Sequence, residues 1–241
     1  MPPFWKNGIF YTQINFEILK RLIIAIDGPA ASGKSTTAKL VASQLGYLHV
    51  DTGSMYRAMT LKVIEEEIDI RDEKAIAKLA RNTHIALAPG EDGFRIKLDG
   101  VDVSDRIRRP DVTGAVSAVS MVSEVRQLMV QEQREMGKRG GIVLEGRDIG
   151  TVVFPEADLK IFMIAHSRER AVRRSKELAA RGIALEIEEL EKQIVERDRK
   201  DSNRSISPLM KAEDAVVLDT TDLTVQEQVN FIVKKAKEKL H

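Results

Sequence analysis

The sequence predicts an α/β fold with a doubly wound parallel sheet, because short apolar segments alternate with helical patterns along the chain. Of the 241 residues, 43% are hydrophobic, which is enough to build a sizeable core. A glycine-rich loop directly follows the first apolar segment, "LIIAID" at 22–27. Ligands of such sheets bind at the carboxyl ends of the strands, so this loop indicates a binding site.

The first half of the chain is expected to alternate between strands and helices: a strand at 22–27, a helix ending at Gly46, a strand at 47–51, a helix from Gly53 to about Glu67 and a shorter helix from Asp72 to Arg81. The segment 84–100 then alternates apolar and polar residues around a turn, which predicts two strands of a small subdomain.

The second half returns to the core pattern: helical spacing from Val112 to Met136, buried strands at 141–146 and 159–165, a basic helix from Arg168 to Ala180, a strand at 215–219 and a closing helix. Inserts are therefore expected after the second strand and after Ala180.

The composition narrows the class of protein. Lys and Arg number 38 against 37 Asp and Glu, so no general field favours nucleic acid or an acidic membrane as a partner. The absence of cysteine excludes disulfides, thiolate metal sites and thiol catalysis. No apolar run approaches the roughly 18 residues of a membrane span, and the first 21 residues lack a signal-peptide pattern. We therefore expect a soluble, cytoplasmic protein.

A phosphate-binding loop is the strongest motif. The segment "GPAASGKS" fits G-x-x-x-x-G-K-[ST] and lies between a predicted strand and a predicted helix, which is the required context. Lys34 would reach the β- and γ-phosphates, and the Ser35 hydroxyl would ligate Mg²⁺. The expected nucleotide site comprises Gly28, Pro29, Ala30, Ala31, Ser32, Gly33, Lys34, Ser35 and Thr36.

Three classes of nucleotide-binding protein fit such a loop: a small-molecule kinase, a GTPase switch and an ATP-driven nucleic-acid motor. The chain has no Asn-Lys-x-Asp segment for guanine, which disfavours the GTPase. Aromatic residues make up only 5%, and the net charge is +1, which disfavours the motor. A kinase remains, and it needs a site for a phosphate acceptor.

Two segments at predicted strand ends are candidates for the acceptor side. In "DTGSMYRA", Asp51 and Thr52 follow the second strand, and Arg57 could hold an acceptor phosphate. The alternative makes Thr52 a helix N-cap and Arg57 a surface cation. In "EGRD", Glu145 to Asp148, acidic and basic groups share a glycine-bearing turn that could serve a metal, a phosphate or a sugar hydroxyl, although a capped loop is the alternative.

The charged segment "RDRKDSNRS" at 197–205 continues an apolar helical stripe. Leu190, Ile194, Arg197, Asp201 and Arg204 follow one another at helical spacings of four, three, four and three. Charges on an inward face need partners, and guanidinium groups suit phosphates. A solvated helix with ion pairs is the alternative, and the same alternative applies to the basic helix 168–180.

The motifs "GPAASGKS", "DTGSMYRA", "EGRDIGTVVFP" and "ERDRKDSNRSISPL", in this order and spacing, resemble the bacterial cytidylate kinase family of P-loop nucleoside monophosphate kinases. The resemblance covers about 22–240 and implies Mg²⁺-dependent phosphoryl transfer from ATP to CMP and dCMP. It also implies the following organisation: an N-terminal extension at 1–21, a core with the phosphate loop at 22–67, a nucleoside-monophosphate-binding insert at 68–110, core at 111–180, a lid at 181–210 and a final core strand and helix at 211–241.

The resemblance also implies roles for individual residues. Thr52 and Arg57 would bind near the CMP phosphate, Arg147 beside that phosphate, and Asp148 at the ribose. The cytosine ring would be read by Ser117, Arg126 and Asp201. Arg197 and Arg204 would contact phosphates of both substrates, Arg173 and Arg174 would lie on the ATP side, and Lys34, Arg147, Arg197 and Arg204 would be catalytic. Two features depart from the family pattern, namely residues 1–21 and Glu145, which stands where some members carry Asp.

Other assignments stay open on sequence grounds. The same fold could phosphorylate UMP, TMP or shikimate, or the chain could be a nucleotide-binding regulatory module. For the leading interpretation we expect a monomer that binds ATP, CMP and dCMP and takes neither nucleic acid nor membrane as a partner.

Overall fold

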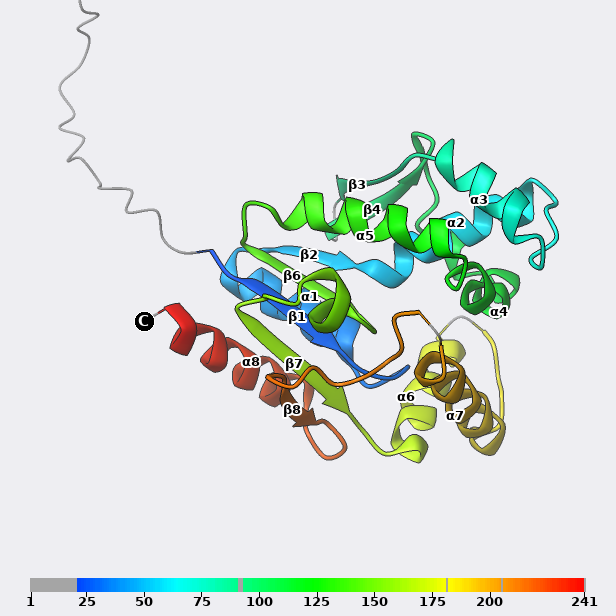
Figure 1. Cartoon of the computed structure of the whole chain (residues 1–241). Coiled ribbons are helices and arrows are strands. Elements are labelled where there is room, and N and C mark those ends of the chain that lie inside the picture. The colour runs from blue at the N-terminus through cyan, green and yellow to red at the C-terminus, as the bar shows by residue number, and fades with distance from the viewer. Residues whose placement is uncertain (1–20, 91–92, 181, 205, 241) are drawn as a thin grey trace, which may run out of the picture.

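A five-stranded parallel sheet lies at the centre of the computed structural model, which describes residues 21–90, 93–180, 182–204 and 206–240 (Figure 1). The strands follow the order β2-β6-β1-β7-β8 across the sheet. Their bounds are β1 Ile23–Asp27, β2 Leu48–Asp51, β6 Ile142–Gly146, β7 Leu159–Ile164 and β8 Val216–Asp219. Strands that follow β1 in the chain lie on both sides of it, so the predicted doubly wound sheet is confirmed.

Helices cover both faces of this sheet (Figure 1). Their bounds are α1 Lys34–Leu45, α2 Thr52–Glu65, α3 Glu73–Arg81, α4 Pro110–Val119, α5 Ser123–Gly137, α6 Ser167–Ala179, α7 Ile187–Ser202 and α8 Val225–Leu240. Among the helices of these described ranges, none combines the length and apolar character that crossing a membrane requires.

Side chains of the central strand β1 alternate between two hydrophobic cores. Ile24 and Ile26 pack with α1 and α8 on one face, whereas Ala25 belongs to the core formed with α2, α4 and α5 on the other. All three are completely buried. Burial of each isoleucine side chain contributes about 1.5–3 kcal/mol. Because both faces are covered, the strand is apolar from Ile23 to Ile26, as the sequence pattern predicts.

The segment between α3 and α4 forms a small antiparallel sheet beside α2. It comprises β3 Ile85–Gly90, β4 Gly93–Leu98 and β5 Val101–Asp102, with Ile85 opposite Leu98. The two predicted strands are present, but β5 was not predicted. Two residues are too few to show an alternating pattern, and β5 forms only because it pairs with Leu98 and Lys97 of β4.

The helical pattern from Val112 to Met136 is interrupted, and two helices, α4 and α5, take its place. At Val122 the backbone is extended, with φ −63° and ψ 121°. The Ser120 hydroxyl donates to the Ser117 carbonyl at 2.9 Å, and the Arg126 Nε donates to the Ser120 carbonyl at 3.3 Å. A buried side chain therefore satisfies the carbonyl that the interrupted helix leaves free, which periodicity alone does not reveal.

Two further predictions concern the N-terminal extension at 1–21 and the basic helix at 168–180. Residues 1–20 of the expected N-terminal extension lie outside the described residues, and Arg21 alone is described. The basic segment 168–180 is helical as predicted and corresponds to α6, while a short η2 turn of π-helix, Ile149–Val153, follows β6. This turn places the residues after "EGRD" at the carboxyl end of the sheet.

Two helical glycines differ in the space around them, which gives a matched stability test. A Cβ on Gly137, at the end of α5, would lie 2.3 Å from the Phe154 ring, whereas a Cβ on Gly114 in α4 would meet nothing within 4 Å. Gly137→Ala should lower the free energy of unfolding by about 1–3 kcal/mol because the core is already filled. Gly114→Ala should raise it by up to about 1 kcal/mol through helix propensity. Urea denaturation measures both, and equal effects would contradict this packing.

Candidate active site

The loop between β1 and α1 has the backbone shape of a phosphate cradle. Gly28, Ala31 and Gly33 have φ angles of 149°, 58° and 95°, and α1 begins at Lys34. A Cβ on Gly28 would lie 2.1 Å from the Met163 carbonyl oxygen, so only glycine fits there. The helix N-terminus and the curled backbone together form a site for anions.

Lys34 is buried within this loop. Its Nζ donates to the Pro29 carbonyl at 2.6 Å and to the Ser32 hydroxyl at 3.2 Å. Burial and the positive charge of Arg147 together lower the pKa of Lys34 to about 7, while Glu145 opposes the shift. Lys34 therefore shares one electrostatic environment with Glu145 and Arg147 of the "EGRD" segment.

Glu145, whose role the sequence left open, faces the phosphate loop. Its carboxylate accepts a hydrogen bond from the Ser35 hydroxyl at 2.6 Å, and its other oxygen lies 3.1 Å from His49 Nε2. Ser35 and Glu145 together offer hard oxygen donors, which suit Mg²⁺. Across the described ranges no group of three or more His, Cys, Asp or Glu side chains could hold a metal. A Mg²⁺ ion at this site would therefore need oxygens from phosphates and water as well.

The acceptor-side residues after β2 lie directly opposite β6. Asp51 pairs in register with Glu145, and its side chain accepts the Ser54 N–H at 3.1 Å, so Asp51 is the N-cap of α2. The alternative that made Thr52 the cap is wrong, because Thr52 is buried and donates to the Glu145 carbonyl at 2.7 Å. Asp51 takes the capping role because its carboxylate reaches the free N–H of the first turn.

Arg57 is half-buried and not a free surface cation. Its Nη1 donates to the Thr113 hydroxyl of α4 at 2.9 Å. Burial lowers its pKa, as do the positive charges of Arg108, Arg174 and Arg147, while Asp51 opposes them. Arg57 thus faces other arginines of the site.

Arg126 and Asp148 form a buried ion pair at 2.7 Å between α5 and the turn after β6. The Arg126 guanidinium also lies 5.2 Å above the centre of the Tyr56 ring, within the range of a cation–π contact. Two of the residues that the resemblance assigned to ribose and cytosine are therefore in direct contact.

Asp201 on α7 links the core to the segment that follows the helix. Arg147 Nε donates to one carboxylate oxygen at 2.9 Å, and Arg204 Nη2 contacts the other. Arg204 also lies 3.5 Å from the Ser117 hydroxyl, and its buried Nε has no hydrogen-bond partner among the described residues. The predicted helical stripe is confirmed as far as Asp201, but α7 ends at Ser202, so Arg204 reaches the site from the loop beyond it.

The remaining lid arginine, Arg197, lies in the same field of positive charge. Burial, together with the charges of Arg147 and Arg57, lowers its pKa to about 10. Arg199, by contrast, is exposed and pairs with Glu196 at 2.8 Å, as its different face predicts. The alternative of a uniformly solvated helix is therefore wrong for Arg197 and Asp201.

Arg173 and Arg174 of α6, which the resemblance assigned to the ATP side, have different partners. Arg173 Nη1 donates to the Thr220 hydroxyl at 3.0 Å. The same atom lies close to Gly33, because a Cβ added to that glycine would be 3.8 Å from it. Arg174 pairs with Glu177, while its charge lowers the pKa values of Arg57 and Arg197. Arg173 thus borders the phosphate loop, and Arg174 faces the arginine cluster.

Comparison with known proteins agrees with this geometry. Residues 24–238 match the cytidylate kinase family. This chain belongs to the cytidylate kinase family. Proteins named cytidylate kinase from Ligilactobacillus salivarius and Limosilactobacillus reuteri are 48% and 50% identical to it, over 93% and 92% of this chain and 100% and 99% of theirs.

A solved structure shares the fold of this cytidylate kinase family member. The crystal structure of an uncharacterized protein from Eubacterium ventriosum aligns with a TM-score of 0.51 at 13% identity, covering 91% of this chain and 99% of the other. At this identity the likeness concerns the fold alone.

Asp27, the last residue of β1, is a residue of the site that the sequence pattern does not reveal. Its carboxylate accepts the N–H groups of Ile149 and Gly150 at 2.9 and 2.8 Å, and so fastens the turn that carries Arg147 and Asp148. Burial raises the pKa of Asp27 to about 6 despite these bonds. Its position directly before the phosphate loop was a signal, but its partners lie more than 120 residues away. His49 was missed for the same reason.

The raised pKa of Asp27 predicts a pH-dependent stability difference. The folded protein takes up a proton at Asp27 near pH 6, whereas the unfolded chain does so near the ordinary aspartate pKa of 3.8. The contribution of Asp27 is therefore largest at low pH and is lost as pH rises toward 6 and beyond. Relative to Asp27→Asn, the parent should lose about 2 kcal/mol of unfolding free energy between pH 4.5 and 7. Denaturant titrations of both proteins measure this loss, and parallel pH profiles would refute it.

Proposed function

We propose that this protein is a cytidylate kinase that transfers the γ-phosphoryl group of ATP to CMP or dCMP, releasing ADP and CDP or dCDP. The observation that carries the proposal is a convergence of positive charge at the carboxyl end of the sheet. Arg57, Arg147, Arg174 and Arg197 come from four separate segments, and burial and their mutual charge lower the pKa values of Arg57 and Arg197. The negatively charged phosphate groups of ATP and CMP would neutralise this cluster.

On the donor side, the loop 28–35 would hold the ATP phosphates. Lys34 would exchange its present bonds to Pro29 and Ser32 for phosphate oxygens. Arg173, which borders Gly33, would lie beside the nucleotide, and Arg174 would face the transferred group.

Mg²⁺ would be held by the Ser35 hydroxyl and by Glu145, directly or through water. When bound, the ion would supply neutralisation of charge on the β- and γ-phosphates. His49 contacts the second oxygen of Glu145 and would keep that carboxylate oriented toward Ser35. This arrangement assigns Glu145 the role that the sequence left open.

On the acceptor side, Arg57 and Arg147 would hold the CMP phosphate, with Asp51 and Thr52 shaping the entry to α2. Asp148 would accept the ribose hydroxyls, and Ser117, Arg126 and Asp201 would contact the cytosine. The contacts from Arg126 to Asp148 and from Arg147 to Asp201 support this grouping, because they bring α5, the turn after β6 and α7 to one place.

The chemistry would be direct in-line transfer without a covalent enzyme intermediate. An oxygen of the CMP phosphate would bond to the γ-phosphorus as the bond between that phosphorus and the β–γ bridging oxygen breaks, leaving ADP. Positioning and charge neutralisation are the main requirements of such transfer. Lys34, Arg147, Arg197 and Arg204 would supply the protein's share of that positive charge.

We further propose the organisation that the resemblance implied. Residues 68–110 would serve as the nucleoside-monophosphate-binding insert, and 181–210 as a lid whose closure excludes water from the γ-phosphate. The protein would act as a cytoplasmic monomer in pyrimidine nucleotide metabolism.

A panel of acceptors tests the proposed function. ATP consumption should be coupled to ADP detection with CMP, dCMP, UMP, TMP, AMP and shikimate, in the presence of Mg²⁺. CMP and dCMP should be turned over, and the other acceptors should be poor. Failure of the folded protein to phosphorylate CMP would overturn the proposal, and activity on a different acceptor would identify another kinase of this fold.

Arg204 provides a test of the transition-state role of the lid. Arg204→Ala should lower kcat about 100-fold, with less effect on the KM for ATP, because its guanidinium would meet charge that develops during transfer. Arg199→Ala, on the exposed face of α7, is the matched control and should retain the parental kcat. Steady-state kinetics with varied ATP and CMP measure both, and an unchanged kcat for Arg204→Ala would contradict the assigned role.

A further inference from the structure

An ion pair between α6 and α7 holds the backbone of the phosphate loop from outside the nucleotide site. Arg170 Nη1 contacts Asp198 Oδ2 and also donates to the Ala30 carbonyl at 3.0 Å. Asp198 Oδ1 accepts the Ala30 N–H at 3.2 Å. Both backbone polar groups of a phosphate-loop residue are thus bound by one Arg–Asp pair.

The pair is buried and well supported. The Arg170 side chain is 8% exposed and that of Asp198 18% exposed, and Arg170 Nε donates to the Ala165 carbonyl at 3.0 Å. A buried ion pair is tolerated when further hydrogen bonds satisfy its groups, as they do here. The basic helix 168–180 is therefore not a uniformly solvated face.

Apolar contacts fix the next loop residue to the same two helices. Ala31 packs against the small core of Ala171 and Leu178 from α6 and Leu190 and Ile194 from α7. Ala31 has a φ of 58°, a left-handed conformation that costs free energy for a non-glycine residue and persists only where its surroundings determine it. The ion pair at Ala30 and the apolar core at Ala31 supply those surroundings.

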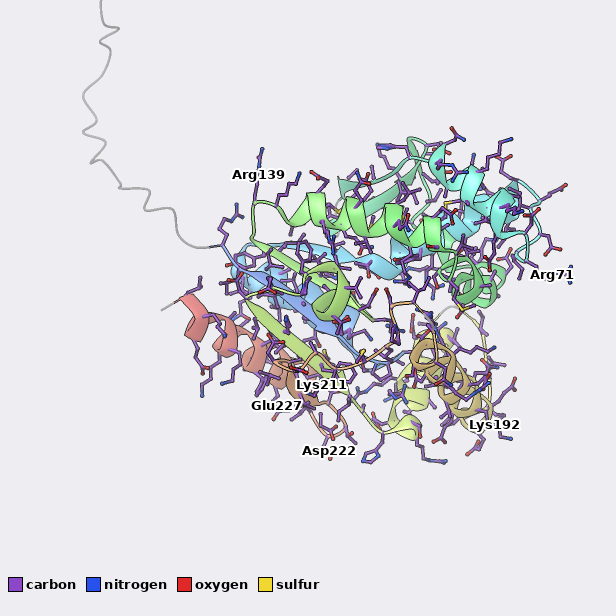
Figure 2. The ribbon with its side chains drawn as sticks, viewed as in Figure 1. Arg71, Arg139, Lys192, Lys211, Asp222 and Glu227 are labelled. Carbon is purple, nitrogen blue, oxygen red and sulfur yellow. The ribbon has the colours of Figure 1, made fainter. Side chains whose placement is uncertain are left out.

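Asp198 lies on the inward side of α7 beside Arg197 and Asp201 but has different partners, namely Arg170 and the backbone of Ala30. It follows Leu190 and Ile194 at spacings of four, whereas Glu196 is partly exposed and Lys192 points outward in Figure 2. Both Asp198 oxygens are already bonded, and a carboxylate would repel phosphates. Asp198 therefore acts on the loop backbone and not on a nucleotide.

We propose that Arg170 and Asp198 are positioning residues that couple the docking of α7, within the lid segment, to the phosphate-binding shape of the loop. When α7 is docked, the pair holds Ala30 and Ala31 in the geometry that the ATP phosphates require. When α7 moves away, the Ala30 N–H loses its bond to Asp198, Arg170 loses its ion-pair partner, and Ala31 loses its apolar contacts with α7. This inference rests on the proposed use of ATP as the phosphoryl donor.

Hydrogen exchange and nucleotide binding of Asp198→Ala test the coupling. In the nucleotide-free protein, exchange of the peptide 28–34 should become faster. The Kd for ATP should rise about tenfold, while the Kd for CMP should change by less than about twofold. Glu196→Ala, which removes a more exposed ion pair on the same helix, is the matched control and should behave as the parent in all three measurements.

A second variant keeps the test decisive if the alanine protein folds poorly. Asp198→Asn retains an acceptor for the Ala30 N–H and loses only the charge that pairs with Arg170, so it should show intermediate shifts. Parental exchange and parental ATP affinity in Asp198→Asn and Asp198→Ala would overturn the inference, as would equal losses of ATP and CMP affinity. If the parent does not phosphorylate CMP, the proposed function fails, while the exchange comparison still decides whether the pair holds the loop.

Discussion

Concentrated positive charge at the carboxyl end of one parallel sheet is the constraint on which the rest of this structure depends. Lys34 and the surrounding arginines are at least partly buried, and burial lowers the pKa values of Lys34, Arg57 and Arg197. Such a cluster is expensive unless carboxylates or bound anions offset it. Asp148 and Asp201 supply part of that compensation through their ion pairs with Arg126 and Arg147. The positive charge that these carboxylates leave uncompensated suits the binding of two phosphorylated substrates.

The sheet makes this concentration possible because parallel strands end at one edge. Asp27 lies opposite Gly146, and Asp51 lies opposite Glu145, so three strands deliver their following residues to one place. The bonds from Asp27 to the turn after β6 then fasten the acceptor side to the strand that begins the donor loop. The donor and acceptor halves of the site thus share a rigid base.

Helix α7 contacts both halves of the site through neighbouring residues of its inward side. Arg197 and Asp201 lie toward the acceptor groups, whereas Asp198 contacts the phosphate loop. One helix therefore touches both halves of the site. It reaches the phosphate loop through Asp198 and the acceptor groups through Asp201, which bonds to Arg147.

Patterns among residues close together in the sequence determined the fold class and the position of the phosphate loop. Apolar runs and helical spacing identified the parallel sheet and most of its helices, and "GPAASGKS" identified the phosphate loop, because these depend on residues close together in the chain. Only the tertiary structure decided the interruption between α4 and α5, the cap at Asp51 and the partners of Asp27, Glu145 and Asp198. Each of these depends on hydrogen-bond geometry, and for Asp27, Glu145 and Asp198 the partners are also distant in sequence. The burial that makes such bonds necessary arises only when the sheet and its helices pack together.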